Sequence, residues 1–272
     1  MTRMRSLCCV LGALCSLTVA ASAADLAAPA DPGGWFGSLS GGYAMTLNED
    51  WQVFSDDLGS DYAPAGIDDG FLGRAVLGYR WSAWDVAGAV QYADFSRGDA
   101  SDYINASGTL RAHMWALDAQ AGYNTMLGNA DLRTAFGLRY AAWNNDVEAY
   151  GNHINHDFRG IGPMVEVDMS KPMSDRFSLE TGLSAAVLFG KTKTNASPGW
   201  FCNDCSTQNA TVLNLEGNLG LGFNLVSARA VLGWQAQWWD NVNVAITDAS
   251  GYGDNEGDSG HFFTGPYLEV RF

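Results

Sequence analysis

The chain has 272 residues, of which 47% are hydrophobic and 12% aromatic, so it carries far more apolar surface than a disordered acidic chain would. Its 30 acidic residues outnumber its 15 basic residues and give a net charge of -15. This charge argues against nucleic acid as a partner, because binding to phosphates requires a basic surface. The length allows one large domain or two small ones.

The chain begins with the pattern of a signal peptide. Two arginines precede an apolar run from Leu7 to Ala21, and residues 21–23 are the small residues that signal peptidase accepts. The run is too short to span about 30 Å of hydrocarbon comfortably. We therefore expect residues 1–23 to be removed on export and residues 24–272 to form a single domain.

Beyond the signal peptide, apolar and polar residues alternate in ten segments, which is typical of β-strands. In the second segment, Phe71 and Leu77 lie on one face, while Arg74 and Arg80 lie on the other. In chain order, the predicted strands cover residues 35–43, 71–81, 84–92, 115–124, 132–140, 161–169, 176–189, 213–223, 229–238 and 262–272.

The apolar face of every segment is free of charged residues, whereas the opposite face collects Arg, Asp, Glu, Asn and Gln. A soluble β-sandwich would bury its apolar face and expose its charges to water. We therefore predict an all-β fold, a transmembrane antiparallel β-barrel whose uncharged face contacts lipid. The charged residues predicted to line its pore are Arg74, Arg80, Asp118, Arg133, Arg139, Glu166, Asp168, Glu180, Glu216, Arg229 and Glu269.

The lengths of the connections support the same fold. Long polar connections, predicted at 44–69, 96–108, 144–157, 191–209 and 240–260, alternate with short ones at 82–83, 128–129, 170–175 and 226–227. Short periplasmic turns, longer extracellular loops and an even number of strands are typical of barrels in the outer membrane of Gram-negative bacteria. Aromatic residues cluster at both predicted ends of the strands, as they do at the two interfaces of a membrane.

Two parts of the sequence resemble known outer-membrane proteins. The last eight residues end in the aromatic Phe272 after alternating apolar positions, which resembles the signal that the barrel assembly machinery recognises. Phe158–Val165, the later Gly-Pro strand and Leu183–Lys191 resemble the Legionella-type pore-forming major outer-membrane protein family over roughly the C-terminal half. This resemblance implies an outer-membrane barrel, with porin activity as one expectation, and transfers no catalytic residue.

The prolines of the two Gly-Pro pairs need an explanation, because a closed barrel has no edge strand on which a missing N–H group would be harmless. We expect Pro163 and Pro266 to lie at a bulge or at the end of a strand.

The sequence leaves the function of the lumen open. Barrels of about eight strands are filled by side chains, whereas porins of roughly 16 to 18 strands enclose a water channel. The inward charges are therefore compatible with a pore for ions or small solutes and with a filled, non-conducting structural or adhesin-like barrel. A third hypothesis is an omptin-like hydrolase that uses His153, His156 and Asp157, although adjacent residues in a strand point in opposite directions. We expect no enzymatic activity and no cofactor.

The long connections suggest further features. After removal of the signal peptide, Cys202 and Cys205 are the remaining cysteines, and we expect them to form a disulfide. The connections 44–69 and 240–260 contain acidic but no basic residues, so they should attract cations, including divalent ions shared with lipopolysaccharide. The other expected partners are outer-membrane lipid and, during biogenesis, the barrel assembly machinery, while the oligomeric state stays open.

Overall fold

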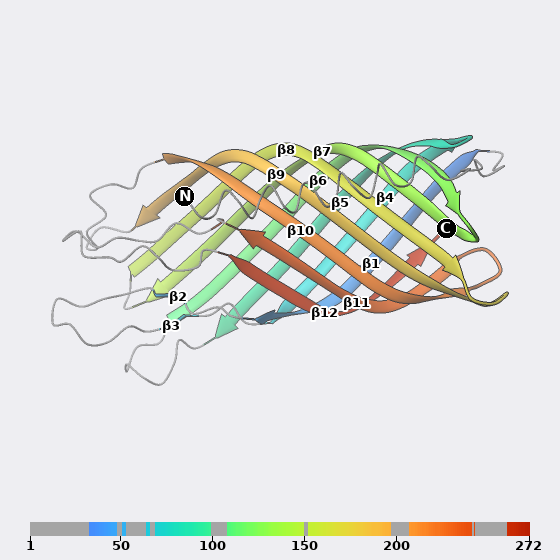
Figure 1. Ribbon diagram of the computed structural model, residues 1–272. Helices are drawn as coiled ribbons and strands as arrows, with labels where there is room; N and C mark the ends of the chain where they lie inside the picture. Colours follow the sequence, from blue (N-terminus) through green and yellow to red (C-terminus); the bar gives the residue numbers. More distant parts are fainter. Residues whose placement is uncertain are drawn as a thin grey trace.

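The computed structural model describes residues 33–47, 51–52, 64–65, 69–98, 108–149, 152–196, 207–240, 242 and 260–272. Within these residues, ten strands form a closed antiparallel barrel, and β2 (Trp51–Gln52) and β3 (Pro64–Ala65) form a separate pair (Figure 1). The barrel strands are β1 (Gly34–Leu47), β4 (Gly70–Trp81), β5 (Trp84–Gly98), β6 (Gly108–Leu127), β7 (Ala130–Ala149), β8 (Asn152–Pro172), β9 (Phe177–Ala196), β10 (Thr207–Asn224), β11 (Arg229–Asp240) and β12 (His261–Arg271). The predicted fold class and strand number are confirmed.

The barrel closes where β1 pairs with β4 on one side and with β12 on the other. The backbones of Phe272 and Gly37 exchange two hydrogen bonds of 2.9 and 3.0 Å, so the last residue of the chain is part of this closure. The C-terminus lies at the end of the barrel that carries the short turns (Figure 1).

The outer face of the barrel is apolar, as the alternation predicts. On β7, Phe136 and Leu138 are 62% and 55% exposed, and Leu117 on β6 and Leu183 on β9 are exposed as well. A water-soluble surface rarely carries such a continuous apolar band. Aromatic pairs border this band: Trp84 and Tyr123 lie on the turn side, and Trp115 and Tyr140 lie on the loop side. These rings match the aromatic belts of a membrane protein.

The short turns lie where the sequence predicts them. Ser82 and Ala83 connect β4 to β5, and Gly128 and Asn129 connect β6 to β7. Ser82 and Gly128 have φ angles of 57° and 64°, the left-handed conformation that two-residue hairpin turns require.

The strands extend further on the loop side than we expect from the sequence. The connection predicted at 144–157 is wrong, because β7 and β8 stay paired from Asn144↔Asp157 to Ala149↔Asn152. The connection predicted at 191–209 is likewise partly strand, since β9 and β10 pair from Lys191↔Asn209 to Lys193↔Thr207. Alternation detects a strand that has one apolar face, whereas these extensions lie beyond the apolar band and are polar. With 20 or 21 residues, β6 to β9 exceed the roughly 9–11 residues that a membrane crossing needs.

The predicted bulge or strand end at the prolines is also wrong. β8 runs through Pro163 without a break and keeps its register with β7. On the other side of β8, the pairs Ile161↔Phe189 and Met164↔Ala186 keep one register, and the two positions between them are unpaired in these described strands. Pro163 therefore leaves two residues unpaired in one ladder, but it does not change the register of the strands.

The glycine before each proline explains why the strands stay together. Pro266 in β12 interrupts the ladder with β1 in the same way. A side-chain carbon added to Gly162 or Gly265 would overlap the backbone carbonyl oxygen of Val187 or Tyr43, respectively. The neighbouring strand approaches so closely only because glycine has no side chain there.

Candidate functional site: the barrel interior

All eleven residues that the sequence places inside the barrel lie on its inner face, and most of them form ion pairs. Eight line one cavity, whereas Asp118, Arg139 and Glu180 are buried within networks of ion pairs.

The centre of the lumen is crossed by an ion-pair network around Arg139, whose side chain is fully buried. Its guanidinium donates hydrogen bonds of 2.7 and 2.8 Å to the carboxylate of Asp118 on β6. It also donates to Glu216 and Asn214 on β10. Because β8 and β9 separate β7 from β10 in the sheet, these contacts span the interior of the barrel.

Arg74 on β4 also belongs to this network. Its guanidinium donates to Glu166 at 2.9 Å and lies 3.6 Å from the carboxylates of both Asp118 and Glu216. The network therefore connects β4, β6, β7, β8 and β10, and it holds these strands at fixed positions around the lumen.

Arg133 extends the network toward the turns. It lies 2.9 Å from Asp85, 3.0 Å from Glu166 and 3.3 Å from Asp168, and it donates to the amide oxygen of Gln120 at 3.1 Å. Asp85 is fully buried and was not among the predicted pore-lining residues, although its position opposite the apolar face of β5 signals an inward side chain.

A second network lies at the turn end and is centred on Glu180, which is also fully buried. Its carboxylate accepts hydrogen bonds from Arg229 at 2.9 Å and from Arg271 at 2.7 Å. The hydroxyl of Ser170 donates to it at 2.8 Å. Arg271 also pairs with Glu269 at 2.8 Å, so β8, β9, β11 and β12 are linked here.

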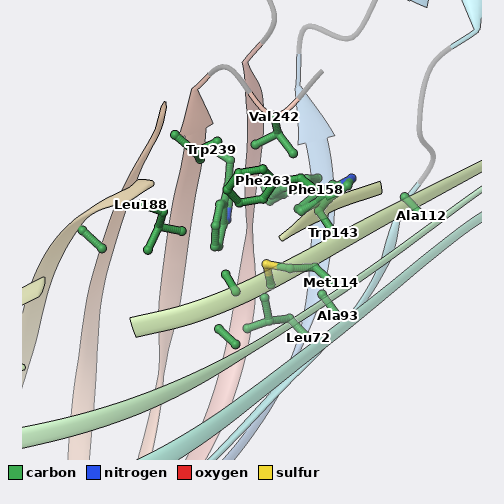
Figure 2. Packing of buried hydrophobic residues seen from close by; sticks show 14 of the residues in the cluster. Leu72, Ala93, Ala112, Met114, Trp143, Phe158, Leu188, Trp239, Val242 and Phe263 are labelled. Carbon is green, nitrogen blue, oxygen red and sulfur yellow. The ribbon is translucent and has the colours of Figure 1, made fainter. Parts of the chain in front are cut away.

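Toward the loops, the inner face is apolar, which the sequence analysis missed. We call this region the apolar layer. Figure 2 shows Trp143, Phe158, Trp239 and Phe263 gathered within it. Its principal members, all of them buried, are Leu72, Ala93, Phe95, Met114, Trp143, Phe158, Leu188, Val212, Trp239 and Phe263.

The rings of the apolar layer meet across the lumen. The centroids of Phe95 on β5 and Phe263 on β12 are 4.4 Å apart, and those of Trp143 on β7 and Trp239 on β11 are 5.9 Å apart. Neither pair is on neighbouring strands. Adjacent aromatic residues were the available sequence signal: in Trp238-Trp239, one ring faces outward and the other inward.

Between the apolar layer and the turn end lies a polar cavity of about 500 Å³. It extends from Leu72 and Gln91 near the middle of the barrel to Arg229 and Phe272 at the turn end. Its charged lining is balanced, with five basic and five acidic residues: Arg74, Arg80, Arg133, Arg229 and Arg271 against Asp131, Glu166, Asp168, Glu216 and Glu269.

The structure does not bring the hydrolase candidates together as a catalytic pair. They lie on β8 and not in a loop. The ring of His156 contacts the hydroxyl of Thr194 at 2.9 Å and the carbonyl of Val242 at 3.2 Å, while Asp157 accepts a hydrogen bond from Asn144. The side chain of His153 lies outside the described part of the chain.

Several other predictions also lie outside the described residues: the signal peptide at 1–23, the disulfide between Cys202 and Cys205, and most of the acidic connections. Among the residues that the structure does describe, no group of three His, Cys, Asp or Glu side chains is arranged to hold a metal ion. The described segments contain no helix with the length and apolarity to cross a bilayer.

A family model, described as the Legionella pneumophila major outer membrane protein precursor, matches residues 46–272. The match extends well beyond the C-terminal half that carries the predicted resemblance. No curated protein matches the chain in sequence.

Among solved structures, several outer-membrane barrels are similar to the chain at low identity. Neisserial surface protein A is 12% identical, with a TM-score of 0.32, over 89% of this chain and 98% of that one. The transport unit of the autotransporter AIDA-I from Escherichia coli is 9% identical, with a TM-score of 0.47, over 88% and 89%. The outer membrane protease OmpT from Escherichia coli is 9% identical, with a TM-score of 0.42, over 90% and 97%. With identities this low and TM-scores below 0.5, none of these likenesses bears on what the chain does.

Proposed function

We propose that the protein forms a narrow pore for ions or small polar solutes and is not an enzyme, from the premise that the chain belongs to the family of the Legionella pneumophila major outer membrane protein precursor. It is a β-barrel of the bacterial outer membrane. In the conformation described here the pore is closed.

The observation that carries the proposal is the polar cavity of about 500 Å³ between the apolar layer and the turn end. A barrel that serves only as a scaffold has no need for such a space, because side chains are able to fill a lumen of this size. The ion-pair networks and the apolar layer interrupt the path. Conduction therefore requires that the apolar layer opens.

The test is the conductance of the refolded mature protein in planar bilayers. We expect rare, brief channel events from the unmodified protein. Replacing Trp143 by Ala removes the ring that contacts both Phe263 and Trp239, and it should make events at least about tenfold more frequent, because the closed state loses packing energy. The matched control is Trp115→Ala, which truncates an exposed ring on the outer face and should leave the conductance unchanged.

The second candidate is a non-conducting structural or surface-interaction barrel. It is favoured by the complete burial of Trp143, Trp239 and Arg139, whose side chains reach partners on distant strands across the lumen. If neither the unmodified protein nor Trp143→Ala conducts, the pore is wrong and this candidate replaces it. Conduction by the variant alone would lead to the same conclusion, since the natural barrel would then be closed.

We further propose four features of biogenesis and surface chemistry. Phe272, whose ring is exposed at the turn end, acts as the signal for the barrel assembly machinery. Cys202 and Cys205 form a disulfide in a surface loop. The acidic connections bind divalent cations together with lipopolysaccharide, and the outer face contacts outer-membrane lipid.

A further inference from the structure

Four uncharged polar side chains that line the cavity have atoms without a hydrogen-bond partner among the described residues. They are Gln91 on β5, with both its amide nitrogen and oxygen, Gln235 on β11, with its amide nitrogen, Tyr267 on β12, with its hydroxyl, and Thr125 on β6, with its hydroxyl. Gln91 and Tyr267 are only 2% and 5% exposed. Leaving a buried donor or acceptor unpaired is costly, so such groups normally have a partner.

Three of these side chains lie just on the turn side of the apolar layer. Each is four residues from an aromatic member of the layer on its own strand: Gln91 from Phe95, Gln235 from Trp239 and Tyr267 from Phe263. Because side chains four residues apart in a strand point the same way, the three groups face the lumen, on the arc of the barrel that runs from β5 through β4, β1 and β12 to β11.

Four of the five arginines that line the cavity are already paired with carboxylates. Arg74 is paired with Glu166, Arg133 with Asp85, and Arg229 and Arg271 with Glu180. An anionic ligand would have to compete with one of these ion pairs. The unpartnered uncharged groups are amides and hydroxyls, which together offer both donors and acceptors.

We propose that this cavity binds a small neutral polyhydroxylated solute, of the size of a mono- or disaccharide, through Gln91, Gln235 and Tyr267. Sugar hydroxyls both donate and accept hydrogen bonds, so they complement an amide and a phenol without disturbing an ion pair. The cavity of about 500 Å³ lies within the range of roughly 300–1,000 Å³ that is usual for small-molecule sites. The inference deepens the proposed function by naming the solute class for the same lumen, and it rests on that function for transport but not for binding.

The experiment is a calorimetric titration. The refolded mature protein in detergent micelles is titrated with D-glucose and, separately, with maltose. We expect saturable binding of at least one of the two sugars. Tyr267→Phe removes only a hydroxyl, and Gln91→Leu replaces the amide by an apolar group of similar size. Each variant should bind the sugar with about tenfold lower affinity. The matched control, Gln208→Leu, changes an exposed glutamine at the loop end of β10 and should bind like the unmodified protein.

A charged analogue and folding controls make the outcome decisive. Glucuronate should bind more weakly than glucose, because Arg74, Arg133, Arg229 and Arg271 are already paired with carboxylates of the protein. The faster migration of folded barrels on unheated gels confirms that each variant is folded, and Tyr267→Phe keeps the shape of the ring if Gln91→Leu fails to fold.

The site is refuted if neither sugar binds saturably or if a charged analogue binds best. It is also refuted if both variants bind like the unmodified protein, because water alone would then occupy the space beside Gln91, Gln235 and Tyr267. These failures are distinct from failure of the pore. A protein that conducts but binds no sugar keeps the proposed function and loses this site. A protein that binds sugar but never conducts keeps the site and loses the pore.

Discussion

The two halves of the lumen are built on the same inward register but have opposite chemistry. Toward the turns, charged side chains from nearly every strand are paired around a polar cavity, whereas toward the loops, aromatic and aliphatic side chains pack against one another. Both arrangements bring distant strands together, one through ion pairs and the other through packing. A polar inner face does not by itself make an open channel, because inward rings such as those of Trp143 and Phe263 meet across the lumen.

The largest expected effect comes from breaking the charged half at its centre. Arg139→Met removes the nearest cation from the buried carboxylates of Asp118 and Glu216, which keep the longer contacts of 3.6 Å to Arg74, and it should lower the free energy of unfolding by about 3–5 kcal/mol. Urea unfolding in lipid vesicles measures this loss.

Two further variants check that the cause is an unpaired charge. Asp118→Asn combined with Arg139→Met should recover part of the lost free energy of unfolding, because one of the two buried carboxylates is then uncharged. Arg176→Met, in the exposed turn between β8 and β9, should have almost no effect. A loss from Arg139→Met no larger than the loss from Arg176→Met would contradict the importance of the network.

The second prediction breaks the apolar half and compares it with the outer face. Leu188 is fully buried in the apolar layer, so Leu188→Ala should leave a cavity and cost about 2–5 kcal/mol in the free energy of unfolding. Leu138→Ala, on the lipid face, should cost less, since lipid chains fill the space. Equal losses in the same urea experiment would mean that the layer is not packed as described.

The third prediction sharpens the distinction between the apolar inside and the apolar outside. Leu138→Arg places a charge on the exposed outer band of β7, and it should cost about 2–4 kcal/mol if the residue lies near the middle of the membrane. The control is Asp175→Arg, in the exposed turn between β8 and β9, where a charge is tolerated because water surrounds it. A negligible loss from Leu138→Arg would show that water, and not lipid, surrounds this face.

The outward face and the inward charges were both predictable from the sequence. Leu138 and Arg139 are adjacent, and strand geometry alone requires that they point in opposite directions, so a sequence of such pairs defines a lipid face and a lumen face. The positions of Phe136 and Arg133 follow from the same rule. This prediction needs no knowledge of which strands come close to each other.

Other features were mispredicted because they depend on contacts between strands. The polar extensions of β7 and β8 at Asn144 and Asp157 carry no alternation, and only their pairing makes them strands. The effect of Pro163 depends on the glycine before it, which lets the neighbouring strand approach without a bulge.

The sequence by itself determined that the chain forms an outer-membrane barrel and which side of each strand meets lipid, because both follow from a local period of two residues. Only the tertiary structure decided which side chains cross the lumen. Trp143 meets Trp239 and Arg139 reaches Glu216, although these partners are far apart in the chain. Their distance is set by the way the ten strands curve around a common axis, and no local pattern encodes that curvature.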